Sequence, residues 1–358
     1  MKVHLVAGFL GSGKTTAITN ASQLLINKGL NASIITNDQG KFQVDSHFVK
    51  SLEIANAEVS GGCFCCNYNQ LDEQIELLRN EVKPDLIFAE SVGSCTDLVA
   101  TVLKPLLNFK NAGIEKLTFT TFVDARLLLT FLRGNELPFE LDTNYIWQKQ
   151  IEESEILVIN KIDLVSEADL AFLTSNVENL YSTKQVLYQN SLDNKSLEQW
   201  LEALEQYSIV NHKTIDVDYE KYGVGEANLA WLDEEIEFVS ENQQALQEAN
   251  IFIDSLIDEF FDRKLPVGHL KFLLQYNGKS KKISYTTVFT EDSDIESNEA
   301  ADRVKLIVNA RIQISPIELR EIVVNAISKQ RGNKTLELIE NSISYFQPGF
   351  PNPTYRIA

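Results

Sequence analysis

Gly8-Phe9-Leu10-Gly11-Ser12-Gly13-Lys14-Thr15-Thr16 is the stretch on which the fold of this chain depends. It matches the pattern G-x-x-x-x-G-K-[ST], in which a loop between a strand and a helix binds phosphate. An apolar run, Val3–Ala7, precedes the stretch, and residues 16–27 have the pattern of a helix. The stretch and its surroundings therefore predict a P-loop, rather than a glycine-rich turn that matches by chance.

The residues of this loop have separate expected tasks. Its glycines allow backbone N–H groups to turn toward phosphate oxygens, and the following helix adds the positive end of its dipole. Lys14 is expected to reach the β- and γ-phosphates, while the Thr15 hydroxyl binds Mg²⁺. The residues predicted to bind the nucleotide here are Gly11, Ser12, Gly13, Lys14, Thr15 and Thr16.

The bulk composition limits the class of protein. The chain has 358 residues, a length that predicts two domains, and its hydrophobic fraction of 44% is typical of folded proteins. The formal net charge of −19 disfavours binding to nucleic acid, and no apolar run is long enough to cross a membrane. No signal peptide precedes the first strand, and three of the four cysteines are clustered, so a reducing cytoplasm is the expected compartment.

Two aspartates follow the second predicted strand, residues 32–36. Asp38 belongs to the loop Asn37-Asp38-Gln39-Gly40, and Asp45 lies a few residues further on. In a nucleotide switch, a carboxylate here can sense Mg²⁺ or the γ-phosphate. An ordinary Asx turn is the alternative for Asp38. Because the loop accompanies a P-loop, we favour the functional interpretation.

A cysteine cluster, Gly62-Cys63-Phe64-Cys65-Cys66, precedes another predicted helix. Glycines beside it let the sulfurs converge, and a helix N-terminus favours thiolates. Thiolates prefer soft or borderline ions, most often Zn²⁺, and three of them leave one tetrahedral position open for a metal that must leave again. A buried cysteine cluster and a redox pair are the alternatives. We expect Cys63, Cys65 and Cys66 to hold the metal and Cys95 to be a small structural residue.

A buried strand predicted within residues 84–93 ends in an acid, Glu90, followed by Gly93. A P-loop enzyme is expected to place such a second metal-facing strand beside the loop. Glu90 would hold Mg²⁺ through water or orient the attacking water, and the Gly93 N–H could sense the γ-phosphate.

Another predicted strand, residues 154–159, runs into Asn160-Lys161-Ile162-Asp163. An aspartate in this position can accept hydrogen bonds from the N1–H and the amino group of guanine, a pair of donors that adenine lacks. The stem of Lys161 can cover the base. At a strand end after a P-loop, the pattern N-K-x-D favours GTP over ATP, so Asn160, Lys161 and Asp163 are predicted to bind the base.

Strands alternate with helices as far as a helix predicted at residues 197–207. This order indicates a parallel sheet with helices on both faces and a ligand at the C-terminal ends of the strands. We therefore predict a P-loop domain at residues 1–212, a smaller α+β domain at 213–328, and an extended, proline-containing tail at 329–358.

The predicted second domain has mixed patterns. A strand is expected at 214–217, an acidic segment of ambiguous structure at 227–240, and a helix with one apolar face at 243–261. Further strands are predicted at 269–276, 282–289 and 303–314, with a hairpin turn at Asn277-Gly278. Ser315-Pro316-Ile317-Glu318 has the pattern of a helix N-cap. An acidic loop at 291–299 is expected to be solvated rather than a metal site.

Taken together, the motifs resemble those of the CobW-type GTP-dependent metallochaperones, relatives of the GTPases that serve nickel insertion into urease and hydrogenase. The resemblance covers about residues 1–210. It implies phosphate binding at the P-loop and guanine recognition at Asn160 and Asp163. It implies switch roles with Mg²⁺ contact for Asp38 and Asp45, beside Thr15 and Glu90. The catalytic residues that follow are Lys14, Glu90 and Asp38.

The resemblance also implies a cargo metal, Zn²⁺ or Co²⁺, on Cys63, Cys65 and Cys66, whose delivery is coupled to GTP hydrolysis to GDP. Its expected partners are a client metalloprotein or a cobalamin-related pathway protein, with a homodimer as a possible assembly. Three features depart from the family. Asp38 stands where Glu is usual, Asn67-Tyr68-Asn69 replaces a frequent Thr-x-Arg, and a histidine-rich stretch is missing.

Three function classes remain open at this point. The first is a GTPase whose turnover controls a metal, and the second is a regulator or activating chaperone for which GTP is a conformational ligand. The third, a small-molecule kinase, is disfavoured by the N-K-x-D motif and the thiol loop. Because the nucleotide motifs contain no evident arginine finger, hydrolysis is expected to be slow without a partner, a metal or dimerisation.

Overall fold

The computed structural model describes residues 1–40, 44–109, 113–207, 213–288, 299–332 and 335–358, with the side chain of Asp38 excepted. These residues form two compact units. The first unit comprises residues 1–39, 52–225 and 350–358, and the second comprises residues 40–51 and 226–349. The domain limits predicted from the sequence stay a prediction, and the compact units follow different limits.

The first unit is built on a seven-stranded parallel sheet with the order β3-β2-β4-β1-β5-β6-β7. Its strands are β1 (Lys2–Gly8), β2 (Ala32–Asp38), β3 (Ala55–Ser60), β4 (Leu86–Glu90), β5 (Lys116–Asp124), β6 (Ile156–Asn160) and β7 (Gln185–Gln189). The central strands are buried almost throughout, as parallel strands covered on both faces must be. This confirms the predicted α/β fold with helices on both faces of the sheet.

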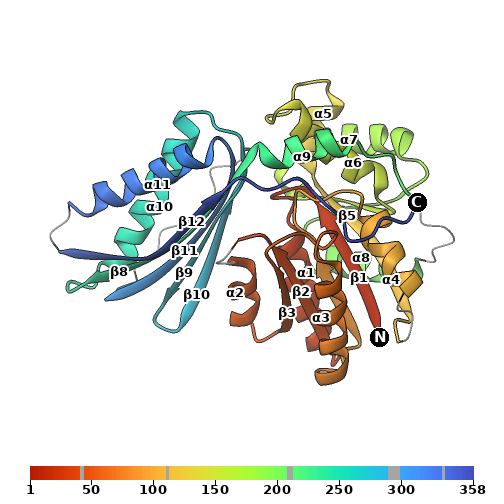
Figure 1. The fold of residues 1–358 in the computed structure, drawn as a ribbon, viewed down its shortest axis with the longest axis horizontal. Helices are drawn as coiled ribbons and strands as arrows, with labels where there is room; N and C mark the ends of the chain where they lie inside the picture. The colour runs from red at the N-terminus through yellow and green to blue at the C-terminus, as the bar shows by residue number, and fades with distance from the viewer. Residues whose placement is uncertain (41–43, 110–112, 208–212, 289–298, 333–334) are drawn as a thin grey trace. The chain divides into compact units, whose positions relative to one another are not determined.

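Helices connect the strands of this sheet or follow its last strand (Figure 1). They are α1 (Lys14–Asn27), α3 (Tyr68–Glu81), the π-helix η1 (Val99–Leu103), α4 (Lys104–Phe109), α5 (Ala125–Leu132), α6 (Leu141–Glu153), the 3-10 helix η2 (Ile162–Leu164), α7 (Glu167–Leu180), α8 (Asn194–Gln206) and α9 (Tyr219–Ala227). The P-loop, the N-K-x-D motif and Glu90 all lie at the C-terminal ends of strands. An open parallel sheet binds its ligands at this edge.

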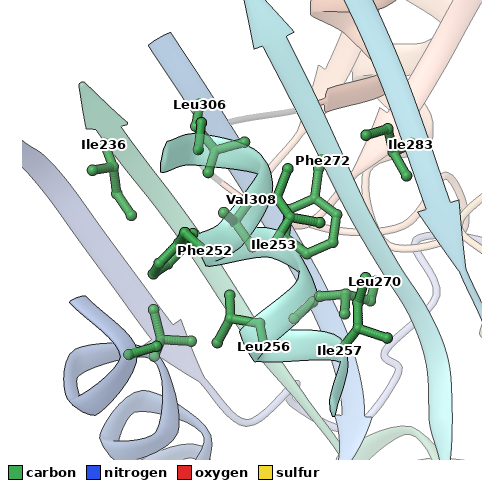
Figure 2. Packing of buried hydrophobic residues seen from close by; sticks show 14 of the residues in the cluster. Ile236, Phe252, Ile253, Leu256, Ile257, Leu270, Phe272, Ile283, Leu306 and Val308 are labelled. Carbon is green, nitrogen blue, oxygen red and sulfur yellow. The ribbon is translucent and has the colours of Figure 1, made fainter. Parts of the chain in front are cut away.

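The second unit is a five-stranded antiparallel sheet with the order β10-β9-β11-β8-β12. Its strands are β8 (Leu229–Ser240), β9 (Val267–Tyr276), β10 (Lys279–Tyr285), β11 (Arg303–Gln313) and β12 (Leu336–Phe346), and its helices are α2 (Val44–Ser51), α10 (Ala245–Asp262) and α11 (Pro316–Gln330). Figure 2 shows apolar side chains of α10, such as Phe252 and Leu256, packed against Phe272 and Val308 of the sheet.

The opposite face of this sheet is covered by α2. Because side chains alternate along a strand, Leu273 and Ile307 point away from the face that α10 covers. They form a small buried cluster with Val44 of α2, and Phe48 packs against it. The backbone N–H of Val44 donates to Asn309 Oδ1 at 2.8 Å. Helix α2 therefore belongs to the core of the second unit, although the sequence places it just after β2.

Two local predictions for the second unit are confirmed. Asn277 and Gly278 both have positive φ, 49° and 72°, and connect β9 to β10 as a hairpin turn requires. The Ser315 hydroxyl accepts a hydrogen bond from the N–H of Glu318 and donates one to its carboxylate, which is the expected helix cap. The acidic segment at 227–240 forms the strand β8.

Two predictions need correction, and two others lie partly outside the described residues. Residues 214–217 are not a strand, and a helix that the sequence did not predict, α9, begins shortly after them. Residues 336–346, expected in an extended tail, pair with β8 as β12. Most of the predicted acidic loop at 291–299, and the end of the strand predicted at 282–289, lie outside the described residues.

Candidate functional site

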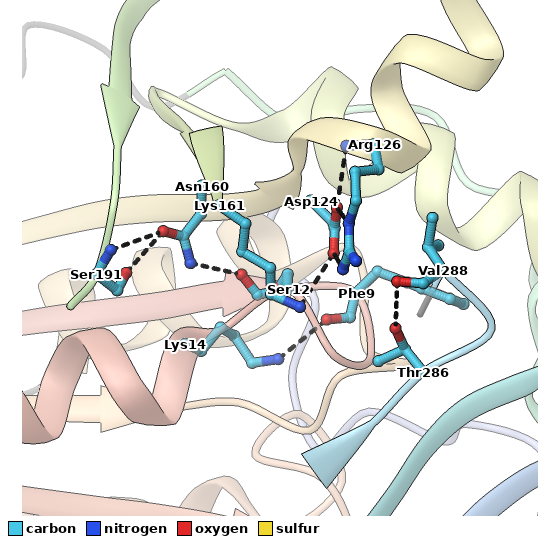
Figure 3. A network of polar contacts seen from close by, with 10 residues as sticks. All are labelled: Phe9, Ser12, Lys14, Asp124, Arg126, Asn160, Lys161, Ser191, Thr286 and Val288. Atoms are coloured by element: carbon cyan, nitrogen blue, oxygen red, sulfur yellow. Dashed lines mark hydrogen bonds and ion pairs between the residues drawn. The ribbon is translucent and has the colours of Figure 1, made fainter. Parts of the chain in front are cut away.

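The P-loop connects β1 to α1 with its lysine folded over the loop. The Lys14 ammonium group donates to the carbonyl oxygen of Gly8 at 2.8 Å. It also donates to the carbonyl oxygen of Phe9 at 3.3 Å (Figure 3). The lysine side chain is buried. A buried ammonium group held at the mouth of a strand–helix loop can exchange such carbonyl partners for phosphate oxygens. The predicted contact of Lys14 with the β- and γ-phosphates therefore stays a prediction with a fitting geometry.

Thr15 and Glu90 meet at the start of α1. The Thr15 hydroxyl donates to Glu90 Oε1 at 2.8 Å, and both side chains are buried. A hydroxyl and a carboxylate at hydrogen-bond distance are the oxygen donors that Mg²⁺ accepts beside phosphates. The two residues predicted from separate motifs thus form one hard-ligand pair that fits Mg²⁺.

Gly13 and Gly93 permit close approaches around this pair. Gly13 has a φ of 90°, and a Cβ atom there would lie 2.3 Å from Asn160 Nδ2. A Cβ atom on Gly93 would lie 2.8 Å from Leu10 Cδ2, so the loop after β4 packs directly on the P-loop. Larger residues at either position would displace the loop that binds the phosphates.

Asn160 ties the loops that follow β6 and β7 to the P-loop (Figure 3). Its amide nitrogen donates to the Ser12 carbonyl at 2.8 Å, and its amide oxygen accepts from the N–H and hydroxyl of Ser191 at 3.2 and 2.7 Å. The side chain of Asn160 is therefore a brace between three loops. Its predicted contact with guanine stays a prediction.

The other two residues of the motif differ in their surroundings. Lys161 has a φ of 63° and forms an ion pair of 3.0 Å with Asp124, a residue that the sequence analysis did not single out. Burial alone would raise the pKa of Asp124, but Lys161 and Arg126 together lower it. Asp163 lies on η2 with an exposed carboxylate that has no hydrogen-bond partner within the described part of the chain. Asp163 is thus free to accept donors from a base.

The thiol loop lies between β3 and α3, and its sulfur atoms converge. The Sγ atom of Cys63 is 2.8 Å from that of Cys65 and 3.3 Å from that of Cys66, and the third pair is 3.8 Å apart. Cys63 and Cys65 are buried and Cys66 is half-buried. Three thiols this close can share one ion. Cys95 is fully buried, and its thiol also interacts with Cys63 and Cys65.

Mutual hydrogen bonding affects the protonation of these thiols. The hydrogen bonds of the Cys65 thiol to Cys63 and Cys66, together with burial, raise the pKa of Cys65 well above its usual value. The hydrogen bond to Cys63 and partial burial raise the pKa of Cys66 to about 11. At neutral pH the metal-free thiols are therefore protonated, and a metal ion must displace these protons to bind.

The family model for the CobW/HypB/UreG nucleotide-binding domain matches residues 2–188. The chain belongs to the CobW/HypB/UreG family.

Curated relatives match a little under half of this CobW/HypB/UreG chain. The zinc-regulated GTPase metalloprotein activator 1 of Dictyostelium discoideum is 29% identical over an alignment of 199 residues that covers 47% of this chain and 41% of that protein. The zinc chaperone YeiR of Escherichia coli (strain K12) is 30% identical over 167 residues, 45% of this chain and 47% of YeiR. The zinc chaperone YjiA of the same strain is 31% identical over 174 residues, 47% of this chain and 51% of YjiA. The chain thus spans about half the length of these relatives.

The two aspartates predicted for the switch of this CobW/HypB/UreG protein belong to different compact units. Asp38 ends β2, and the structure does not describe its side chain. Asp45 lies in α2 of the second unit, where its carboxylate oxygens accept from Lys271 and Lys282 at 2.5 Å each. Burial alone would raise the pKa of Asp45, but the two lysines lower it below its usual range. Nothing in this environment supports the predicted Mg²⁺ contact of Asp45.

Asn37, the residue before Asp38, has a role that the sequence analysis missed. Its amide nitrogen donates to the carbonyls of Gly62 at 2.7 Å and Val59 at 3.0 Å. Its amide oxygen accepts from the N–H of Phe64 at 2.9 Å. Asn37 therefore clamps the backbone on both sides of Cys63. The sequence Asn37-Asp38-Gln39-Gly40 indicated a loop, but it gave no indication that the Asn37 amide would hold the thiol loop.

In the part of the chain that the structure describes, no helix combines the length and the apolar character needed to span a membrane.

Proposed function

We propose that this CobW/HypB/UreG protein is a GTP-binding and GTP-hydrolysing metallochaperone. It binds Zn²⁺ or Co²⁺ as cargo at Cys63, Cys65 and Cys66 and couples GTP hydrolysis to delivery of that metal. The convergent sulfurs support the metal site. Relatives that are named zinc chaperones support zinc as the first candidate.

The residues of the nucleotide site have distinct tasks in this proposal. Lys14 neutralises charge on the β- and γ-phosphates, and the carboxylate of Asp163 accepts the two donors of guanine. Thr15 and Glu90 hold Mg²⁺, which stabilises the charge that develops on the transferred phosphoryl group. Glu90 also orients water. Arg126 is engaged with Asp124 by two hydrogen bonds, at 3.0 and 2.7 Å, so this arginine does not serve as a finger, and slow hydrolysis is expected.

The observation that carries the proposal is the clamp made by Asn37. This residue lies on β2 directly before the switch residue Asp38, and it bonds the backbone on both sides of Cys63. A shift of the β2 end with the nucleotide state therefore moves the thiol loop as well. Nucleotide and metal then bias the same element, which is the physical requirement for coupling.

Zn²⁺ affinity should therefore differ between the GTP-bound and GDP-bound protein. A coupling free energy of about 1–3 kcal/mol corresponds to a factor of roughly 5–150. The measurement is competition with a chromophoric chelator in each nucleotide state. By reciprocity, zinc must change the ratio of GTP to GDP affinity by the same factor.

The Asn37→Ala variant should bind zinc and nucleotide but lose most of this difference. Asn67→Ala is the matched control, because Asn67 also braces the loop, through Ser60 O at 3.1 Å, but from the α3 side. Equal zinc affinity in the two nucleotide states of the wild type would leave a metal site without a chaperone mechanism. That outcome would favour the alternative function, a GTP-dependent regulator with a structural thiol site.

Guanine selectivity should collapse in the Asp163→Ala variant. The substitution leaves the donors of the base without their acceptor, at a cost of about 1–3 kcal/mol, or roughly ten- to a hundredfold in the preference for GTP over ATP. Competitive binding of the two nucleotides measures the ratio. Glu167→Ala, which removes a nearby exposed carboxylate, should leave it unchanged. An unaltered GTP preference in Asp163→Ala would contradict the guanine assignment.

The partner proposed for delivery is a client metalloprotein or a cobalamin-related pathway protein, in the cytoplasm. A homodimer is a further proposal. The net charge of −19 does not suit nucleic acid as a partner.

A further inference from the structure

Residues 350–358, here called the strap, belong to the first unit, although they directly follow the second unit in the chain. Strap residues have no helix or strand structure. The strap contains two prolines, Pro351 and Pro353, which fix part of its backbone. Its contacts decide where this segment lies.

The strap is bonded directly to the thiol loop. The N–H of Asn352 donates to Cys66 Sγ at 3.3 Å. Two residues on, the N–H of Thr354 donates to the carbonyl of Cys65 at 2.8 Å, and the Thr354 hydroxyl donates to the carbonyl of Cys66 at 2.8 Å. The carbonyl groups of Cys65 and Cys66 and the sulfur of Cys66 are thus hydrogen-bonded to residues almost 300 positions away in the sequence.

Beyond the thiol loop, the strap has a second set of anchors. The Tyr355 ring lies edge-on to Tyr68 of α3, with centroids 5.2 Å apart. Arg356 Nε donates to Asp97 Oδ2 at 2.7 Å, and the Asp97 side chain is buried. The N–H of Ile357 donates to the carbonyl of Ala100 at 2.9 Å. These contacts fix the strap without touching a sulfur atom.

The position of Cys66 gives this arrangement a consequence for metal exchange. Cys66 is the least buried of the three thiols, so an incoming ligand meets it first. A hydrogen bond donated to its sulfur stabilises the thiolate that a metal requires. Handover to another protein is an exchange of ligands, which needs access to this side of the site.

We propose that the strap covers one side of the metal site and can be released from it. When docked, it orients the Cys66 thiolate and slows exchange of the bound metal, and its release opens the thiol loop for transfer. This inference rests on the proposed binding of metal at the thiols. The strap directly follows Gly349, the last residue of the second unit.

The test compares two substitutions at one position. Asn352→Pro removes the N–H donor, and the position already precedes Pro353, so its backbone is extended in either case. Asn352→Ala keeps the donor and is the matched control. Arg356→Ala removes the ion pair with Asp97 from the second set of anchors and touches no thiol. Purified full chains are loaded with Zn²⁺, and transfer to a chromophoric chelator is followed in time, with GTP binding as the check on folding.

Asn352→Pro and Arg356→Ala should each accelerate zinc transfer, Asn352→Pro by about ten- to a hundredfold, the worth of a hydrogen bond to a charged group. The Asn352→Ala variant should transfer zinc at the wild-type rate. Wild-type rates in both Asn352→Pro and Arg356→Ala would overturn the inference and leave the proposed function intact. Absence of thiol-dependent zinc binding in the wild type would instead overturn the proposed function.

Discussion

The Cys65→Ser variant should lose nearly all of its affinity for Zn²⁺ and keep its affinity for GTP. Cys65 is the most deeply placed thiol of the loop, with sulfur contacts of 2.8 and 3.8 Å to its two neighbours. A serine hydroxyl does not ionise at neutral pH and is a poor ligand for a borderline ion. Structural zinc sites release about 10–16 kcal/mol over four ligands, so one thiolate is worth roughly 3–4 kcal/mol, a factor of about 10²–10³.

Competition with a chromophoric chelator measures this loss, and the dependence on pH adds an independent signature. The pKa of Cys66 is raised to about 11, so the free thiols hold their protons at neutral pH. Zinc affinity in the wild type should therefore rise as pH increases and fall as it decreases, and the serine variant should show a shallower slope because one fewer proton is displaced.

Cys95→Ala is the discriminating companion, because Cys95 is fully buried and its thiol interacts with two of the other cysteines. The three-thiolate site predicts that this variant binds zinc almost as the wild type does. A loss as large as that of Cys65→Ser would make Cys95 a fourth ligand and the site a closed one. Unchanged zinc binding in Cys65→Ser itself would remove the metal site from this loop.

GTP hydrolysis should be almost abolished in the Lys14→Ala variant. The lysine is buried, and its ammonium group lies over the P-loop on the carbonyls of Gly8 and Phe9. Removal of one preorganised charged donor from the phosphates costs about 3–4 kcal/mol at the transition state, or a factor of roughly 10²–10³ in kcat/KM. Nucleotide affinity should fall as well, since the charge also acts in the ground state.

Two variants separate this effect from others. Lys28→Ala removes an equal charge beside the end of α1, where the ammonium is half exposed and paired with Glu198 at 2.6 Å, and it should change little. Glu90→Gln should slow turnover with GTP affinity preserved, because Glu90 acts on Mg²⁺ and water. Steady-state kinetics with a phosphate-release assay measure all three. Wild-type turnover in Lys14→Ala would contradict the P-loop assignment.

The parts of the fold that the sequence predicted are those with strong local signals. Buried apolar runs ending in motifs identified the parallel sheet, and turn and cap residues marked the hairpin and the last helix. Strand β12 escaped prediction because it is an edge strand with two glutamates, several other polar residues and little buried surface. Helix α9 was missed because it contains Gly223 and Gly225, which are poor helix formers. Gly225 is explained by packing, since a Cβ atom there would lie 2.2 Å from the Asp142 carbonyl.

In the candidate site, too, some contacts could be predicted from the sequence and others could not. Thr15 and Glu90 come from two recognisable motifs at neighbouring strand ends, so their meeting could be predicted. The environment of Asp45 could not, because its partners Lys271 and Lys282 lie 226 and 237 residues away and carry no motif. The strap likewise reaches Cys66 from 286 residues away. Contacts of this range depend on the tertiary fold and leave no periodic pattern in the chain.

The chain passes from one compact unit to the other four times, at residues 39–40, 51–52, 225–226 and 349–350. On the ribosome, α2 emerges long before the sheet that buries Val44 and the lysines that pair with Asp45. The nascent chain must therefore carry this helix without its core until β9 and β11 have been made. The second unit is complete once Gly349 has been added, whereas the first still awaits residues 350–358. Within residues 1–358, the first unit therefore receives its last residues only after the second unit has received all of its own.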